Sequence, residues 1–185
     1  MPNHITNIVT FEGEETKVKE IVDYLNTKDG PDEQQFDFAK IIPVEDKNDS
    51  SGWAQVDEHR KKWGTKWNSY DLSFKDNVFT FDTAWSTPFL VIERLSQIFP
   101  DVLIKVKYAD EDIGSNCGWY DLKNGIELGG HHYNWIQNVG SDGNAESIFF
   151  ACEVKGWSTK DIDENFDGLW TRVNRLKKLD QVNED

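Results

Sequence analysis

The chain is poor in sulfur and in positive charge. Among its 185 residues are two cysteines and one methionine, and 20 Lys and Arg face 34 Asp and Glu, which gives a formal net charge of −14. Two cysteines are too few for a disulfide framework, so we expect reduced thiols and an intracellular protein. A protein that coats nucleic acid carries an excess of positive charge, so this acidic composition disfavours that role.

Long apolar runs and familiar catalytic motifs are also missing. The apolar stretches 89–92 and 148–152 are far shorter than the about 18 residues that cross a bilayer, and residues 1–4 do not begin a signal peptide, so no membrane role is expected. No Gly-x-Gly-x-x-Gly, Walker, serine-elbow or Cys-x-x-Cys motif occurs. Nucleotide-dependent, acyl-transfer and thiol-redox chemistry are therefore not first hypotheses, and no cofactor is predicted.

Aromatic residues are abundant. They make up 13% of the chain and include eight tryptophans, against 37% hydrophobic residues overall. An aromatic side chain buries about 150–250 Å² in a core, enough to offset the tendency of an acidic, polar chain to stay unfolded. The length then fits one folded domain whose carboxylates lie on the solvated surface.

Hydrophobic periodicity predicts the order strand, helix, strand, strand, helix, strand. Residues 5–11, 69–74, 78–85 and 102–108 alternate as strands, and a helix after Glu12-Gly13 buries Val18, Ile21, Val22 and Leu25. Thr87 is the expected N-cap of the second helix, with Pro88 as its first residue. This order is typical of an α+β ferredoxin-like fold, an antiparallel sheet with two helices on one face.

The rest of the chain elaborates this fold. Asn124-Gly125 predicts an added β-hairpin over residues 118–128, which completes a domain of residues 1–128 with a long insertion at 31–68. Residues 129–185 are expected to form a C-terminal extension packed on the same domain. Within it we predict a polar loop at 129–143, a strand at 146–154, a short acidic helix capped by Ser158 or Thr159, and a last helix that begins near Leu169.

Four segments carry a family resemblance. They are Met1–Asn7, Phe38–Pro43, Trp63-Gly64-Thr65-Lys66-Trp67 and Thr83–Pro88, and they occur in this order. Over residues 1–125 the chain resembles the YubB-like family, uncharacterised proteins of plasmids and phages with a ferredoxin-like domain. The resemblance implies the fold and a mobile-element origin, and we expect the protein in the cytoplasm of the bacterial host. It supplies no catalytic residues.

One basic segment, residues 59–67, stands out in this acidic chain. A helix is predicted from Trp53 to Trp63 with Gly64 as its C-terminal cap, and cations and tryptophans alternate across its end. In one interpretation the cations hold a phosphate or an acidic peptide while a tryptophan stacks on a base. In the other, the tryptophans anchor the long insertion and the cations interact with the helix end. The candidate binding residues are Arg60, Lys62, Trp63, Lys66, Trp67 and Trp85.

His131, His132 and Tyr133 are the weak catalytic candidates. They lie in the predicted loop, and a histidine there would be a general base in phosphodiester cleavage. Adjacent side chains on an extended backbone point in opposite directions, so the two imidazoles are unsuited to one metal ion, and no metal site is predicted. The alternative is that these residues belong to a loop that covers a face of the sheet and has no catalytic role.

Two functions follow from these observations. The first is a non-enzymatic accessory protein of a phage or plasmid that binds a host protein through an acidic, tryptophan-bearing surface. Its concrete version inhibits a nucleic-acid-based defence system, restriction or CRISPR, because an acidic surface is steered to a positively charged groove. The alternative is an RNA-binding or RNA-cleaving protein that uses segment 59–67 and the His131-His132 loop.

Overall fold

The computed structural model describes residues 2–26, 36–45 and 52–175. The helices and strands follow the chain as β1 (His4–Glu12), α1 (Glu15–Leu25), α2 (Phe38–Ile41), α3 (Trp53–Trp63), β2 (Tyr70–Lys75), β3 (Val78–Ala84), α4 (Phe89–Ile98), β4 (Leu103–Asp110), β5 (Cys117–Lys123), β6 (Ile126–Tyr133), α5 (Gly140–Gly143), α6 (Ala145–Val154) and α7 (Thr159–Asn165). Residues 169–175 are also helical. Among the described residues, no helix is long and apolar enough to cross a membrane.

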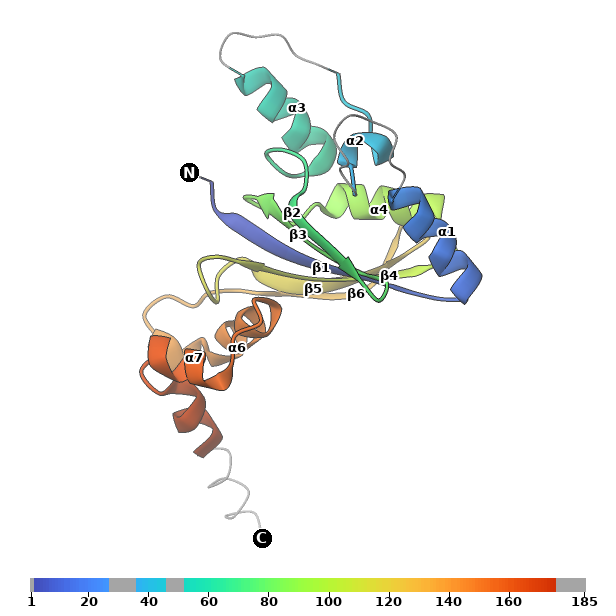
Figure 1. The fold of residues 1–185 in the computed structure, drawn as a ribbon. Helices are drawn as coiled ribbons and strands as arrows, with labels where there is room; N and C mark the ends of the chain where they lie inside the picture. The colour runs from blue at the N-terminus through green and yellow to red at the C-terminus, as the bar shows by residue number, and fades with distance from the viewer. Residues whose placement is uncertain (1, 27–35, 46–51, 176–185) are drawn as a thin grey trace.

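The predicted ferredoxin-like fold is confirmed. Six strands form one antiparallel sheet in the order β2-β3-β1-β4-β5-β6, and α1 and α4 lie on one face of it (Figure 1). The alternation in β1 has the predicted effect, because Ile5, Asn7, Val9 and Phe11 are buried while Thr6, Ile8 and Thr10 between them are only partly buried. The hairpin β5–β6 extends the sheet beyond β4.

The insertion after α1 folds back onto the domain. Phe36 and Phe38 are fully buried and contact the rings of Phe79 and Phe81 in the core. Helix α3 ends at Gly64 in the left-handed conformation, as its sequence predicts. Both α2 and α3 pack against α4, so the insertion thickens the layer on this face (Figure 1).

The start of α4 differs from the prediction. Pro88 is the N-cap and the helix begins at Phe89, so Thr87 does not cap it. The Thr87 hydroxyl instead lies 3.0 Å from the Tyr120 hydroxyl oxygen on β5. A proline N-cap has no side-chain oxygen to bind the first amides, and the hydroxyl of Thr87 is used to join the helix start to the sheet.

Two predictions for the C-terminal region were wrong. Residues 129–133 continue β6 rather than forming a loop, so His131, His132 and Tyr133 are strand residues. Residues 145–154 form helix α6 rather than a strand. Helix α6 packs against the sheet on one side and against α7 on another, so its buried residues lie on several sides. Its sequence therefore lacks the 3.6-residue hydrophobic period that identifies an amphipathic helix.

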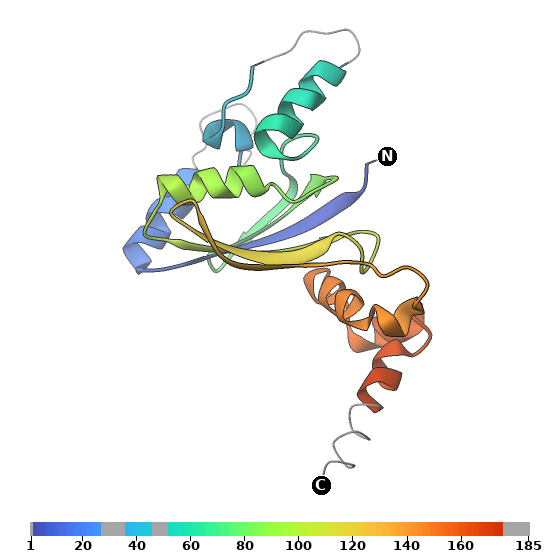
Figure 2. The same ribbon diagram turned by 180° about the vertical axis from the view of Figure 1, so that it is seen from behind.

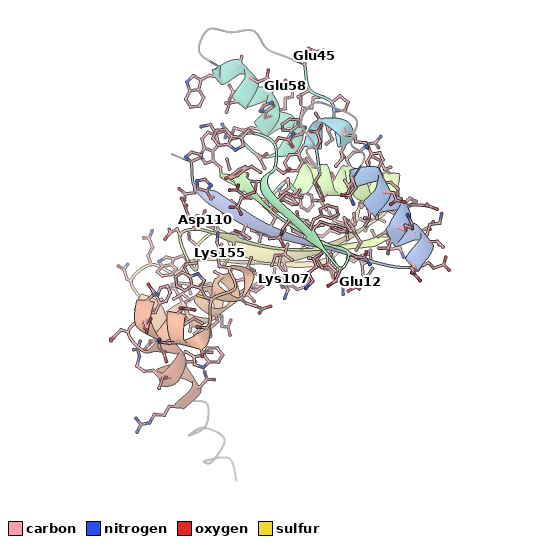
Figure 3. The ribbon with its side chains drawn as sticks, in the orientation of Figure 1. Glu12, Glu45, Glu58, Lys107, Asp110 and Lys155 are labelled. Carbon is pink, nitrogen blue, oxygen red and sulfur yellow. The ribbon has the colours of Figure 1, made fainter. Side chains whose placement is uncertain are left out.

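Helix α6 covers the face of the sheet opposite α1 and α4 (Figure 2). Ala151 and Val154 pack on Ala109 and Cys117. Two polar contacts tie its end to the strands: Lys107 Nζ lies 2.6 Å from Glu153 Oε1, and Lys155 Nζ donates to Thr6 Oγ1 at 2.9 Å (Figure 3). Burial against the sheet lowers the pKa of Lys155.

The capping of α7 is confirmed. Ser158 is its N-cap, and the side chains of Ser158 and Asp161 each bind the other's backbone amide. Ile162 and Leu169 are buried with Ile148 of α6, which holds α6, α7 and residues 169–175 together. The predicted last helix does begin at Leu169, and residues beyond Arg175 lie outside the described part of the chain.

Candidate functional site

Four of the six predicted binding residues lie together at one end of the sheet. Arg60 is in the last turn of α3, Lys66 and Trp67 follow Gly64, and Trp85 follows β3. The two segments are joined directly: the Lys66 amide donates to the Ala84 carbonyl oxygen, and the Ser86 hydroxyl donates to the Gly64 carbonyl oxygen. We call Arg60, Lys66, Trp67 and Trp85 the aromatic-cation cluster.

Cations lie over both indole rings of this cluster. Lys66 Nζ is 4.6 Å from the centre of the Trp67 ring and 4.8 Å from that of Trp85. The guanidinium carbon of Arg60 is 5.6 Å from the Trp85 ring centre. These distances are within the range of cation–π attraction, so the Trp85 ring attracts both cations and the Trp67 ring attracts Lys66. Trp67 is 36% exposed, which leaves part of its ring open to solvent.

The other two predicted residues lie apart from the cluster. Trp63 is 3% exposed, its Nε1 donates to the Ile42 carbonyl oxygen, and its ring stacks on His59 and contacts Phe38. Its ring is therefore part of the core and anchors the insertion, as the second interpretation of the segment expects. Lys62 is exposed, and in the described structure it contacts neither Trp67 nor Trp85 as a cation over the ring.

Trp85 is held in an unusual backbone conformation. Its φ is +75°, in the left-handed region that bulky residues rarely adopt. The Trp85 amide donates to the Asn3 carbonyl oxygen at 3.0 Å, and Asn116 Nδ2 donates to the Trp85 carbonyl oxygen at 3.2 Å. A strained conformation of this kind persists only where surrounding contacts fix it.

The contacts around Trp85 meet at one buried carboxylate that the sequence did not single out. Asp110, at the end of β4, is 3% exposed (Figure 3). Its Oδ1 accepts from Asn3 Nδ2 at 3.1 Å and from the Asp112 amide at 3.0 Å, and its Oδ2 accepts from Asn116 Nδ2 at 3.1 Å. The sequence shows Asp110 only as part of an acidic turn, because its partners Asn3 and Asn116 lie outside that turn.

The histidines of β6 face opposite sides of the sheet. His132 Nδ1 lies 2.8 Å from the Tyr108 hydroxyl on the α4 side, whereas the His131 ring contacts Tyr133, which packs on Phe150 of α6. Burial raises the pKa of Tyr108 to about 12, so this hydroxyl stays protonated near neutral pH. The geometry does not bring the two imidazoles to one reacting group.

An aromatic groove of about 580 Å³ runs between α6 and α7. Glu146 and Glu153 are among its lining residues, and two lining rings, those of Phe149 and Trp170, contact each other at 5.0 Å. Burial raises the pKa of Tyr133 in this groove, and the carboxylate of Glu146 raises it further. The lining, which we call the α6–α7 groove, comprises Tyr133, Glu146, Phe149, Phe150, Glu153, Trp157, Thr159, Ile162 and Trp170.

The groove lies in an acidic part of the chain. Residues 140–167 contain seven Asp and Glu and two Lys. Sequence reasoning missed the groove because residues 146–154 were assigned to a strand. A signal was nevertheless present, since two tryptophans, Trp157 and Trp170, flank a run of acids. Among the described residues, no three His, Cys, Asp or Glu side chains are grouped to hold a metal ion.

Comparisons with known proteins agree with the fold. Residues 62–148 match the family model for the ferredoxin-like domain in Api92-like protein. The chain contains a ferredoxin-like domain. A crystal structure of the protein Api92 from Yersinia pseudotuberculosis is similar at 18% identity and a TM-score of 0.44, over 56% of this chain and 41% of that one. No curated protein matches. The matched range begins in α3 and ends in α6, so it contains Lys66, Trp67, Trp85 and Asp110.

Proposed function

We propose that the protein is a non-enzymatic binding protein that docks a basic, amphipathic segment of a partner protein in the α6–α7 groove. The observation that carries the proposal is the combination of an aromatic lining with carboxylates in one groove. Tryptophan and tyrosine are enriched among the few residues that carry most of the binding energy of an interface, and carboxylates favour a partner of opposite charge.

Glu146 and Glu153 have different roles in this docking. Glu146 is exposed and, within the described residues, has no ion-pair partner, so it is open to a cation of the partner. Glu153 already pairs with Lys107, and a partner cation would share it. The aromatic rings Phe149, Trp157 and Trp170 are only partly buried and would receive the apolar anchors of the segment.

The biological setting of this proposal comes from the resemblance to the YubB-like family. A phage or plasmid protein in a bacterial cytoplasm meets host defence proteins, whose nucleic-acid grooves carry positive charge. A net charge of −14 accelerates encounter with such a groove. We therefore propose a host restriction or CRISPR protein as the partner, with inhibition by competition for its nucleic-acid-binding surface.

The experiment is capture from bacterial lysate with the full chain and three variants. Glu146→Gln removes one groove carboxylate, Trp170→Ala removes part of the aromatic lining, and Glu58→Gln is the matched control at the α3 end of the molecule (Figure 3). We expect a nucleic-acid-binding protein that elutes with salt, whose capture falls about tenfold in the groove variants and is unchanged in the control. If both groove variants captured as much of the partner as the parent protein does, the proposal would be refuted.

The RNA-cleaving alternative has less geometric support. His131 and His132 point to opposite faces, and the hydroxyl nearest His132 belongs to Tyr108, whose raised pKa disfavours acid–base exchange near neutral pH. Incubation with labelled RNA, with and without Mg²⁺, tests it. Cleavage that is lost when both histidines are changed to Ala would favour the enzyme over the binding protein.

A further inference from the structure

The aromatic-cation cluster concentrates positive charge that the protein itself leaves largely unpaired. In the described structure Lys66 has no ion pair, and the nearest carboxylate oxygen to Arg60 is Asp57 Oδ1 at 3.9 Å, between side chains that are 60% and 72% exposed. Exposed pairs at this distance neutralise little charge. Both cations thus lie within cation–π distance of the same Trp85 ring, and an anion that contacts both of them would be stabilised.

The protein positions this cluster before any ligand arrives. Hydrogen bonds to Asn3 and Asn116 fix the left-handed backbone of Trp85 on both sides. The side-chain amides of both asparagines donate in turn to the carboxylate of the buried Asp110. The Lys66 carbonyl oxygen is bound by His59 Nδ1 at 2.9 Å. A rigid site loses less conformational entropy on binding, and strained residues of this kind gather at ligand sites.

We propose that the aromatic-cation cluster binds a nucleotide unit, with its phosphate between Arg60 and Lys66 and its base against Trp67. The partly exposed indole suits a planar base, and the two cations suit a phosphate. Because the whole protein carries a charge of −14, a long polyanion is repelled, and the ligand is a free nucleotide or a short single strand. At physiological salt, charges beyond about 8 Å are screened, which leaves the local cations effective. The site is independent of the α6–α7 groove.

The test is titration of the full chain at low salt with three probes: adenosine monophosphate, a single-stranded RNA octamer and inorganic phosphate. Lys66→Met removes the shared cation. Lys62→Met is the matched control, because Lys62 is a nearby exposed lysine outside the cluster. We expect Lys66→Met to weaken binding of the nucleotide or the octamer at least tenfold, and Lys62→Met to change it less than twofold. Far-UV circular dichroism checks that both variants fold.

The probes distinguish the source of the ligand. Binding of the monophosphate assigns the site to a free nucleotide, and binding of the octamer alone assigns it to a single strand. Trp67→Ala is expected to weaken the nucleotide about tenfold and to leave phosphate binding unchanged. Three results would overturn the proposal: no binding of either nucleotide probe, phosphate that binds as tightly as the nucleotide, or equal effects of Lys66→Met and Lys62→Met.

Discussion

Gly118 provides a sharp test of how β5 and β6 are paired. It lies opposite His132, and a methyl group at its Cα would overlap the His131 carbonyl oxygen and come within 2.8 Å of the Tyr108 hydroxyl. The first of these neighbours is backbone and cannot move without separating the strands. Gly118→Ala therefore forces either β6 or the Tyr108–His132 contact to shift.

The magnitude follows from two opposing effects. Overpacking costs about 1–3 kcal/mol, and a clash with backbone belongs near the upper end, at about 3 kcal/mol. Replacing glycine also removes freedom from the unfolded chain, which restores about 0.4–1 kcal/mol. We expect Gly118→Ala to lower the free energy of unfolding by about 2 kcal/mol. Gly129→Ala is the matched control in the same hairpin, since its methyl would meet only Trp119 at 3.6 Å, an ordinary contact.

Urea unfolding followed by circular dichroism measures the free energy of unfolding of both variants. The imidazole NMR signals of His132 report whether its contact with Tyr108 changes. Gly129→Ala should stay within about 0.5 kcal/mol of the parent or exceed it, because it gains the entropic term without a clash. If Gly118→Ala were as stable as Gly129→Ala and left His132 unperturbed, the assignment of residues 129–133 to a strand paired with β5 would be refuted.

Three further predictions concern the core, a helix cap and the thiols. Trp63→Ala should lower the free energy of unfolding by about 3–5 kcal/mol because its ring is buried. Trp67→Ala should lower it by less, because Trp67 is 36% exposed, and equal losses in urea unfolding would contradict the separation of core from cluster. Ser158→Ala should cost about 1 kcal/mol. Hydrogen bonds from Ser158 lower the pKa of Asp161, so they add to the free energy of unfolding above the ordinary carboxyl pKa, and this contribution is lost as the pH falls through the lowered pKa of Asp161. The difference in free energy of unfolding between Ser158→Ala and the parent should therefore narrow in acid. A difference that widens in acid would contradict this account. Burial raises the pKa of both cysteine thiols to about 11, so Ellman's reagent at pH 8 should react slowly with the native protein and rapidly in urea, while fast native reaction would place a thiol at the surface.

The candidate sites were predictable to different degrees. Arg60, Lys66 and Trp67 stand out in the sequence because cations and indoles alternate there in an acidic chain. Their partner Trp85 was also named, but its left-handed backbone is fixed by Asn3 and Asn116, which lie far from Trp85 in the chain and are joined through Asp110. The α6–α7 groove was not predicted, since it requires knowing that residues 145–154 form a helix.

The sequence by itself determined the ferredoxin-like sheet, because β1, β3 and β4 each bury one face and their apolar residues alternate accordingly. It also determined the end of α3 at Gly64 and the start of α7 at Ser158, where local backbone chemistry decides the outcome. Only the tertiary structure decided which secondary structure residues 129–154 adopt. Helix α6 is buried between the sheet and α7, and a segment covered on several sides has no hydrophobic period to indicate helix or strand. The extension of β6 through two glycines and two histidines is likewise fixed by its pairing with β5, a contact between segments that periodicity within one segment cannot reveal.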